Sequence, residues 1–243
     1  MTPFFVDYVK NAGPKALTKW VHYLDVYERE FARYRTRPLS FLEIGVFRGG
    51  SIPMWKAYFA NADRLAFIDI DPACKEHEIP GTHVRIGSQA DPAFLAEIAA
   101  EFGPFDIVLD DGSHISEHQI TSLKALWPHV ADGGLYVVED CHTSYWPGFG
   151  GGYKAPHSFI EFAKNVVDTM HSWYTDDDDA FPVDAQAKAL ESVRFYDSIT
   201  ILEKRLRADP PTSFVAQNGQ LSFSRKALEL RGRKSSFAGK DGT

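Results

Sequence analysis

Three carboxylates in two short motifs have the residue types and spacing to bind a hard metal ion. Asp111 follows one expected strand, and Glu139 and Asp140 follow the next strand along the chain. Neighbouring parallel strands lie about 5 Å apart, so the three side chains could face one point. Oxygen ligands of this kind suit Mg²⁺, and without a cation the carboxylates would repel one another. The alternative is that one or two of them cap the following helices; we favour metal binding.

Two histidines flank this carboxylate group and are candidates for a general base. His114 follows Asp111 in the motif Asp-Gly-Ser-His, and His142 comes shortly after Asp140. Imidazole titrates near neutrality, so either side chain could accept a proton from a substrate. A single loop histidine is usually only a surface residue. Two histidines beside one acidic group favour a catalytic role for at least one of them, and His114 is the first candidate.

A glycine-rich turn precedes these motifs and is typical of a site for an anionic or nucleotide-like ligand. Residues 41–51 indicate a buried strand that ends at Gly45, a turn through Gly49 and Gly50, and a helix with Ser51 as its expected N-cap. This arrangement offers free backbone N–H groups and a positive dipole end to a ligand. The alternative is a tight turn that binds nothing.

The acidic residues near the turn indicate which ligand it would bind. Asp69 ends the second expected strand, about 20 residues beyond Gly45, where dinucleotide sites place the acid that hydrogen-bonds the ribose. Asp71 is the second choice, and a role in a turn is the alternative for both. A sheet edge that binds a ribose in this way occurs in sites for NAD, FAD or S-adenosylmethionine. The spacing E-x-G-x-x-x-G-G, which begins at Glu43, differs from the pyrophosphate-binding GxGxxG. This spacing favours S-adenosylmethionine. The acidic pairs at the ends of strands four and five favour it too, because a hydride-transfer site does not require them.

The hydrophobic pattern supplies the elements that would position these residues. From residue 38 onwards apolar runs alternate with helical stretches, which predicts parallel βαβ units in a doubly wound, mostly parallel α/β sheet. The expected strands are 39–44, 65–69, 82–86, 105–110 and 134–139, and the helices between them are 51–60, 91–101 and 116–127. Such sheets bind ligands at the carboxyl ends of their strands, which is where this sequence places its acids.

The N-terminal region predicts helical structure packed on the main domain. Between residues 2 and 37, aromatic side chains such as Trp20 and Tyr23 recur at helical spacing. Lys19, His22 or Tyr23 could instead reach into a site. The spacing favours simple packing for most of these side chains.

The region after the fifth strand carries further expectations. Residues 141–153 are glycine-rich and aromatic, and we expect them to form a mobile lid or a substrate wall above the acidic edge. A helix is expected from about residue 157 to 173, followed by four aspartates at 176–179 that a solvated loop explains better than a cation site. Residues 191–204 predict a hairpin that adds an antiparallel strand to the sheet. The chain from about residue 231 predicts a disordered tail.

The bulk composition narrows the classes of function. The 243 residues are 44% hydrophobic and 24% charged, which fits one large globular domain with small extensions. A net charge of −7 argues against a nucleic-acid partner. Cys74 and Cys141 lie far apart and imply no disulfide framework, so the cytoplasm is the expected compartment. No apolar run predicts a signal peptide or a membrane span.

Taken together, the motifs resemble those of class I S-adenosylmethionine-dependent methyltransferases. Within that class the sequence is similar to the group of rhamnosyl O-methyltransferases, cephalosporin-hydroxylase-like proteins and macrolide-sugar O-methyltransferases. The resemblance covers about residues 18–205, and the motifs of strands four and five are its most specific part. The motifs that carry it are Lys-Trp-Val-His-Tyr at 19–23, Leu-Glu-Ile-Gly-Val at 42–46, Gly-Gly-Ser at 49–51, Ile-Asp-Ile-Asp at 68–71, Asp-Gly-Ser-His at 111–114, Val-Glu-Asp at 138–140 and Thr-Ser-Tyr-Trp-Pro at 143–147.

The resemblance implies a seven-stranded Rossmann-like methyltransferase sheet and assigns roles at the matching positions. In the macrolide-sugar enzymes the aspartate of the Asp-Gly-Ser-His motif and both acids of the Glu-Asp pair hold Mg²⁺, and the histidine of the first motif is the proposed base. Here these residues are Asp111, Glu139, Asp140 and His114, with His142 as the second candidate for the base. The expected S-adenosylmethionine contacts are Glu43, Gly45, Gly49, Ser51, Asp69, Gln89, Asp91 and Asp110. Relatives commonly have Gly-Asp-Gln where this chain has Gly-Ser-Gln at 87–89, so adenine contact falls to Gln89 or Asp91.

The expected function is metal-dependent O-methylation, with S-adenosylmethionine and Mg²⁺, of a hydroxyl on a sugar or glycosylated small molecule. The alternatives are a catechol-type diol O-methyltransferase, a non-catalytic cofactor-binding protein and an NAD-dependent enzyme. The expected organisation is a helical extension at 1–37, the methyltransferase domain at 38–205 and a C-terminal extension at 206–243. A homo-oligomer is compatible with the sequence, and no membrane partner is expected.

Overall fold

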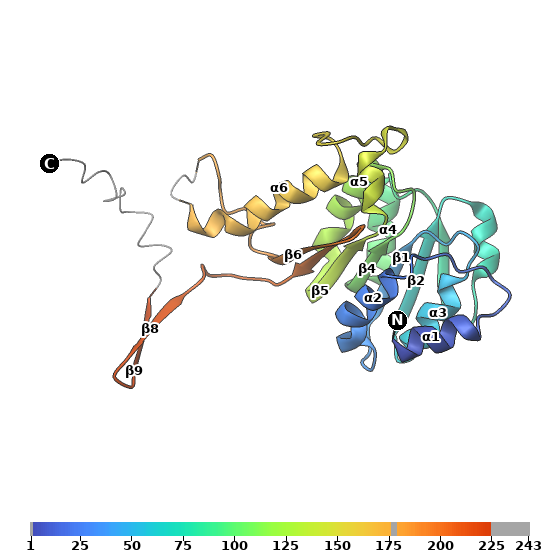
Figure 1. Ribbon diagram of the computed structural model, residues 1–243, viewed down its shortest axis with the longest axis horizontal. Coiled ribbons are helices and arrows are strands. Elements are labelled where there is room, and N and C mark those ends of the chain that lie inside the picture. Colours follow the sequence, from blue (N-terminus) through green and yellow to red (C-terminus); the bar gives the residue numbers. More distant parts are fainter. Residues whose placement is uncertain (1, 176–178, 225–243) are drawn as a thin grey trace.

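The structure is a computed structural model that describes residues 2–175 and 179–224. Its centre is a seven-stranded sheet with the order β3-β2-β1-β4-β5-β7-β6 (Figure 1). Strands β1 to β5 run parallel, while β7 pairs antiparallel with β5 and with β6. The strands are β1 (Ser40–Ile44), β2 (Arg64–Asp69), β3 (His83–Ile86), β4 (Phe105–Asp110), β5 (Val130–Val138), β6 (Leu190–Tyr196) and β7 (Ile199–Lys204). The predicted doubly wound sheet with an antiparallel hairpin is confirmed.

Helices cover both faces of this sheet and divide the core into two hydrophobic clusters. One face carries α1 (Pro3–Lys10), α2 (Tyr23–Phe31) and α3 (Ser51–Tyr58), and the other carries α4 (Pro92–Phe102), α5 (Ser116–Leu126) and α6 (Phe159–His171). Along β1, Phe41 belongs to the first cluster and Leu42 to the second, because successive side chains of a strand point to opposite faces. The central strands are therefore apolar on both faces, as a parallel sheet between helices requires.

The N-terminal region consists of two helices joined by an irregular segment, and not of continuous helical structure. Helix α1 ends at Lys10 and α2 begins at Tyr23, with no helix or strand between them. The pair Gly13-Pro14 accounts for the interruption, because glycine weakens a helix and an interior proline removes one of its hydrogen bonds. The irregular segment reaches the carboxyl ends of β4 and β5, where Lys19 contacts acidic side chains.

Short 3₁₀ turns occupy several connections. They are η1 (Ala32–Tyr34), η2 (Pro72–His77), η3 (Trp127–His129), η4 (Cys141–Tyr145), η5 (Pro147–Phe149) and η6 (Ser172–Tyr174). Two of them, η4 and η5, lie in the predicted lid segment at 141–153. The fifth strand starts at Val130, four residues before its predicted beginning.

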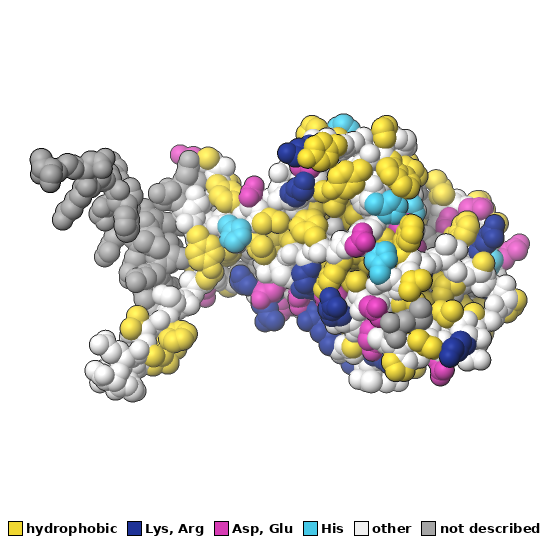
Figure 2. Space-filling view, viewed as in Figure 1, with side chains coloured by type: hydrophobic (Ala, Val, Ile, Leu, Met, Phe, Trp, Pro, Cys, Tyr) yellow, Lys and Arg dark blue, Asp and Glu magenta, His cyan; other side chains and the backbone are white. Residues whose placement is uncertain are grey.

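A separate two-stranded hairpin, β8 (Ser213–Gln217) and β9 (Gln220–Ser224), projects from the body of the molecule (Figures 1 and 2). Its turn is Asn218-Gly219, with φ angles of 51° and 73°. Asn-Gly between two short apolar runs is a strong hairpin signal that our sequence interpretation did not use. Phe214 and Phe223 on this hairpin are mostly exposed.

Two sequence expectations fall partly or wholly outside the described residues: the aspartate run, at positions 176–178, and the tail from about residue 231. Within the described part of the chain, no helix is both long and apolar enough to cross a membrane.

Candidate active site

Unusual backbone conformations mark the carboxyl ends of the central strands. Phe47, His114 and Asp140 have φ angles of 51°, 58° and 51°, in the left-handed region. Residues other than glycine rarely adopt this region, and those that do cluster at functional sites. Gly45 has a φ of 100°, and a Cβ atom there would lie 2.1 Å from the carbonyl oxygen of Asp111. Glycine at position 45 therefore lets β1 and β4 end close together.

A cavity of about 490 Å³ opens at this edge of the sheet. Its volume lies within the range of about 300–1,000 Å³ that is usual for small-molecule and cofactor sites. The predicted site residues in its lining are Gly45, Asp69, Gln89, Asp111, His114 and Asp140. Five predicted cofactor residues lie outside the lining: Glu43, Gly49, Ser51, Asp91 and Asp110.

Asp69 lies in the cavity wall and also holds the glycine turn. Its Oδ2 accepts hydrogen bonds from the backbone N–H groups of Val46 at 2.7 Å and Phe47 at 3.0 Å, and its Oδ1 accepts one from Asp71 at 2.9 Å. Burial opposes ionisation, but these donors outweigh it and hold the pKa of Asp69 below its usual range. The cavity therefore contains a fixed carboxylate that can accept hydrogen bonds from hydroxyl groups. Asp71, the second choice, also lines the cavity and caps η2 by accepting the N–H of Ala73.

Glu43 and Ser51 hold the glycine turn from within the protein. Glu43 is fully buried and accepts hydrogen bonds from the Ser51 hydroxyl at 2.6 Å and the Trp55 indole at 3.1 Å. Burial raises the pKa of Glu43 to about 7. The expected N-cap role of Ser51 is wrong by one position: Gly50 is the N-cap, and Ser51 is the first residue of α3. A Cβ at Gly49 would meet the His77 ring.

Asp110 lies in a buried polar network beneath the cavity. It accepts hydrogen bonds from the Ser122 hydroxyl at 2.5 Å and from the Gln89 amide at 3.0 and 3.2 Å, and burial raises its pKa to about 6. The Gln89 carbonyl oxygen accepts the N–H of Ser113 at 2.6 Å. Gln89 therefore lines the cavity with its amide already bonded to the protein. Asp91 is the N-cap of α4.

A second cavity, of about 280 Å³, adjoins the first. It is lined by Thr18, Lys19, Trp20, Tyr23, Asp111, Glu139 and Asp140. Thr18, Asp111 and Asp140 also line the first cavity. The N-terminal segment thus forms a wall of the candidate site. The packing expected for most of these side chains holds for Tyr23, which is buried in the core, while Lys19 and Tyr23 also hydrogen-bond to predicted metal ligands.

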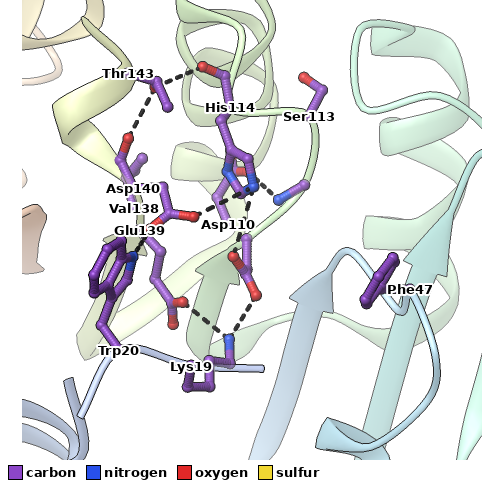
Figure 3. Close-up of polar contacts among 12 residues, drawn as sticks. Lys19, Trp20, Phe47, Asp110, Ser113, His114, Val138, Glu139, Asp140 and Thr143 are labelled. Carbon is purple, nitrogen blue, oxygen red and sulfur yellow. Dashed lines mark hydrogen bonds and ion pairs between the residues drawn. The ribbon is translucent and has the colours of Figure 1, made fainter. Parts of the chain in front are cut away.

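Asp111, His114 and Asp140 come together where the two cavities meet. Asp111 and Asp140 line both cavities and His114 lines the larger one, and Figure 3 shows His114 beside Asp140. One potential ligand atom from each lies within 4.8 Å of the others. His114 Nε2 is 3.4 Å from Asp140 Oδ2 and 4.0 Å from Asp111 Oδ1. The Thr143 hydroxyl is within hydrogen-bonding distance of the carbonyl oxygens of His114 and Asp140, at 2.9 and 2.8 Å, and so links the two loops. Two partly exposed carboxylates beside an imidazole fit the donor set of a divalent cation.

Glu139, the third predicted metal ligand, is buried and bonded to the protein through both oxygens. Its Oε1 accepts a hydrogen bond from the Tyr27 hydroxyl, and its Oε2 lies 2.9 Å from Lys19 Nζ. Burial raises the pKa of Glu139 well above its usual range. The Lys19 ammonium is also buried, but Asp111 and Glu139 outweigh that penalty and raise the pKa of Lys19. Lys19 is one of the three N-terminal side chains that could reach into a site on the sequence alone, and the structure places it among these acids.

His142 lies beside the acidic group in a row of aromatic side chains. Its Nδ1 bonds to the Ser198 hydroxyl and is 3.9 Å from Asp140 Oδ1. Its ring meets those of Trp20 and Trp146 edge-on, at centroid distances of 5.8 and 4.8 Å. Both tryptophans are about half exposed. Figure 2 shows histidine, acidic and hydrophobic side chains gathered on one face of the molecule. The predicted aromatic lid therefore provides one part of an aromatic surface, and Trp20 provides another.

Comparison with known proteins identifies the domain. The family model described as a methyltransferase domain matches residues 42–141. The chain contains a methyltransferase domain. A Streptomyces olivaceus protein, 8-demethyl-8-alpha-L-rhamnosyl tetracenomycin-C 2'-O-methyltransferase, is 39% identical over 198 residues, covering 77% of this chain and 52% of the relative. Mycinamicin VI 2''-O-methyltransferase of Micromonospora griseorubida is 47% identical over 132 residues, covering 51% of this chain and 33% of the relative.

A solved structure of this methyltransferase type matches the fold. It is the MycE methyltransferase of the mycinamycin biosynthetic pathway in complex with Mg, S-adenosylhomocysteine and mycinamycin VI. The TM-score is 0.74 at 32% identity, covering 86% of this chain and 55% of MycE. These matches confirm the Rossmann-like methyltransferase fold and the resemblance to sugar O-methyltransferases. The chain spans about half the length of the first relatives it matches.

Proposed function

We propose that this protein transfers a methyl group from S-adenosylmethionine to a sugar hydroxyl, with a divalent cation held in the acidic site. The observation that carries the proposal is the position of Asp111 and Asp140 on the wall between a cofactor-sized cavity and a smaller one, with His114 beside them in the larger cavity. A reaction between a bound cofactor and a bound acceptor needs its chemical groups at such a boundary. Further support comes from a relative that methylates a rhamnosyl tetracenomycin and from the MycE structure, which was solved with Mg and mycinamycin VI.

The larger cavity is the proposed cofactor site. Asp69 would accept hydrogen bonds from the ribose hydroxyls, since it is held ionised and lines the cavity. Gly45 would leave room for the methionine end of the cofactor above the strand. Glu43, Ser51 and Asp110 would act from behind the cavity by fixing the turn and the Gln89 side chain.

The smaller cavity is the proposed acceptor site. Asp111 and Asp140 would hold Mg²⁺, with Glu139 as the predicted third ligand. Bound there, the ion would lower the pKa of an acceptor hydroxyl and stabilise its alkoxide. His114 Nε2 points to the same place and would remove the hydroxyl proton, with His142 as the second candidate. Because the methyl donor is already activated, alignment of the two reactants by the cavity walls would supply much of the rate.

The aromatic surface supports a ring-shaped acceptor. Trp20 lines the smaller cavity, and the row through His142 and Trp146 leads outward from it. Aromatic faces can cover the apolar side of a sugar ring and exclude water from the reacting oxygen. Either a glycoside or a catechol could pack on this surface and present a diol to the ion, and the relative that methylates a rhamnosyl tetracenomycin favours the glycoside.

The experiment that tests this function is a transfer assay with a panel of acceptors. Purified protein is incubated with S-adenosylmethionine, Mg²⁺ and either rhamnosyl glycosides, macrolide glycosides or simple catechols, and products are measured by mass spectrometry. We expect a mass gain of one methyl group on a glycoside only. Methylated catechol alone would support the catechol-type alternative. Calorimetric binding of S-adenosylhomocysteine without any transfer would support the non-catalytic alternative, and binding of NAD instead would overturn the cofactor assignment.

A further inference from the structure

Lys19 occupies the centre of the acidic group, although it lies 92 residues from Asp111 and 120 from Glu139 in the sequence. Its Nζ is 2.6 Å from Asp111 Oδ2, 2.9 Å from Glu139 Oε2 and 3.5 Å from Glu43 Oε1, and the side chain is 5% exposed. An ammonium group has three N–H donors and no acceptor. Two hydrogen bonds go to Asp111 and Glu139, and Glu43 Oε1 lies at ion-pair distance, so carboxylates surround the ammonium.

The position of Lys19 is fixed by the segment that carries it. On one side, Lys15 Nζ donates to the His77 carbonyl oxygen at 3.1 Å. On the other side, the Trp20 indole and the Tyr23 hydroxyl donate to Asp140 Oδ1 at 3.1 and 2.7 Å. The ammonium is therefore delivered to the acids by a segment attached at both ends, and is not a long side chain sampling solvent.

Lys19 divides the carboxylate oxygens into two sets. Asp111 Oδ2 and Glu139 Oε2 face the ammonium (Figure 3). Asp111 Oδ1 and Asp140 Oδ2 face His114 instead. A divalent cation bound by Asp111 and Asp140 can use the second set, whereas both oxygens of Glu139 are already bonded, Oε2 to Lys19 and Oε1 to Tyr27. Glu139 Oε2 is therefore an oxygen for which Lys19 and the cation compete.

We propose that Lys19 is a built-in counter-ion of the acidic site, which holds Asp111 and Glu139 side by side and competes with the divalent cation for their oxygens. Lys19 is thus a positioning residue that acts through the carboxylates, from the wall of the proposed acceptor cavity. Removal of its charge frees oxygen atoms on two carboxylates and removes a positive charge next to the cation. Both effects act in the same direction, toward tighter binding of the divalent ion.

The proposal rests on the proposed cation site, and cation binding can be measured without cofactor, acceptor or turnover. The test is a titration of the full chain with Mn²⁺, followed by the electron paramagnetic resonance signal of the free ion. Lys19→Met keeps the length of the side chain and removes its charge. We expect its Mn²⁺ dissociation constant to fall at least about tenfold relative to the unaltered protein. We also expect Lys19→Met to unfold at a lower temperature in EDTA, and Mn²⁺ to raise its Tm more than that of the unaltered protein.

Two controls separate this effect from general damage. Lys15→Met removes a lysine from the same segment that bonds to a carbonyl oxygen and to no carboxylate, so its Mn²⁺ affinity should stay that of the unaltered protein. Lys19→Arg keeps the charge and should not show the tighter binding of Lys19→Met. Binding of S-adenosylhomocysteine should be unchanged in Lys19→Met, because Lys19 does not line the larger cavity.

The outcomes distinguish this proposal from the proposed function. If the unaltered protein binds Mn²⁺ and Lys19→Met binds it equally or more weakly, the counter-ion proposal is overturned while the cation site stands. If only Lys19→Met binds Mn²⁺, competition by Lys19 is supported. If neither protein binds Mn²⁺, the cation site and the counter-ion proposal both fail.

Discussion

Replacement of Asp110 by asparagine should change how the stability of the fold depends on pH. Asp110 is fully buried at the end of β4, and it accepts hydrogen bonds from Ser122 and Gln89. Burial disfavours its charged form and raises its pKa from 3.8 to about 6. An asparagine side chain would keep a similar shape and one acceptor oxygen but would not titrate.

The size and sign of the effect follow from that shift. Between about pH 4 and pH 6 the folded state holds the Asp110 proton more tightly than the unfolded state does, so the free energy of unfolding falls as the pH rises. A shift of roughly two units corresponds to about 3 kcal/mol, most of which should be lost by pH 7. The Asp110→Asn variant has no group that titrates at this position, so its free energy of unfolding does not fall for this reason. Its stability relative to the unaltered protein should therefore increase by up to about 3 kcal/mol as the pH rises from 4 to 7.

The assay is urea unfolding followed by tryptophan fluorescence, in EDTA, at several pH values across this range. The comparison is the difference in unfolding free energy between the two proteins, which cancels the contribution of other titrating groups such as Glu43. Ser122→Ala is a second variant, for which we expect the opposite change in pH dependence. It removes a hydrogen-bond donor that lowers the pKa of Asp110, so the free energy of unfolding should depend more steeply on pH. The reasoning would be refuted if the difference in unfolding free energy between Asp110→Asn and the unaltered protein stayed constant with pH.

Three further substitutions test the site itself. His114→Ala should lower the methyl-transfer rate by about 10²–10⁴-fold while binding of S-adenosylhomocysteine persists, and a near-normal rate would move the role of base to another residue such as His142. Trp20→Leu should raise the KM for a glycoside about threefold to tenfold with little change in kcat, as measured by initial rates; a loss confined to kcat would argue against an acceptor wall. Gly45→Ala should destabilise the fold by at least about 2 kcal/mol in urea unfolding, because its Cβ would meet the Asp111 carbonyl at a φ of 100°. Gly148→Ala is its control, because a Cβ there meets no atom within 4 Å.

The sheet and its acidic edge could be predicted because the responsible signals are local. Each parallel strand is a short apolar run bounded by polar residues, and the βαβ alternation indicates a parallel sheet. The ends of β4 and β5 then bring Asp111 and Asp140 together without any knowledge of side-chain positions. His114 was found for the same reason, since it lies a few residues beyond a strand end.

The contribution of the N-terminal segment could not be read from the same signals. Trp20 and Tyr23 show helical spacing, yet α2 begins only at Tyr23, and Lys19 and Trp20 lie before it in irregular conformation. Their partners are more than 90 residues away in the chain, so no local pattern encodes the contact. Only the packing of tertiary structure shows that a lysine lies among the acids.

The distinction between lining a cavity and supporting it was also beyond the sequence. Glu43, Ser51 and Asp110 stand where cofactor contacts were expected, but their side chains bond to buried groups of the protein. A polar residue at a strand end points into the cavity or into the core according to the alternation of the strand and the local turn. The error in the N-cap of α3, by a single residue, has the same origin.

The central claim, cation-dependent methyl transfer, is tested most directly by the rate of product formation with and without a chelator. The protein is assayed with S-adenosylmethionine and a glycoside acceptor in Mg²⁺, then in EDTA, and finally after Mg²⁺ is restored in excess. The proposed mechanism predicts a fall of at least about 100-fold in EDTA and full recovery with the ion. An undiminished rate in EDTA would contradict it.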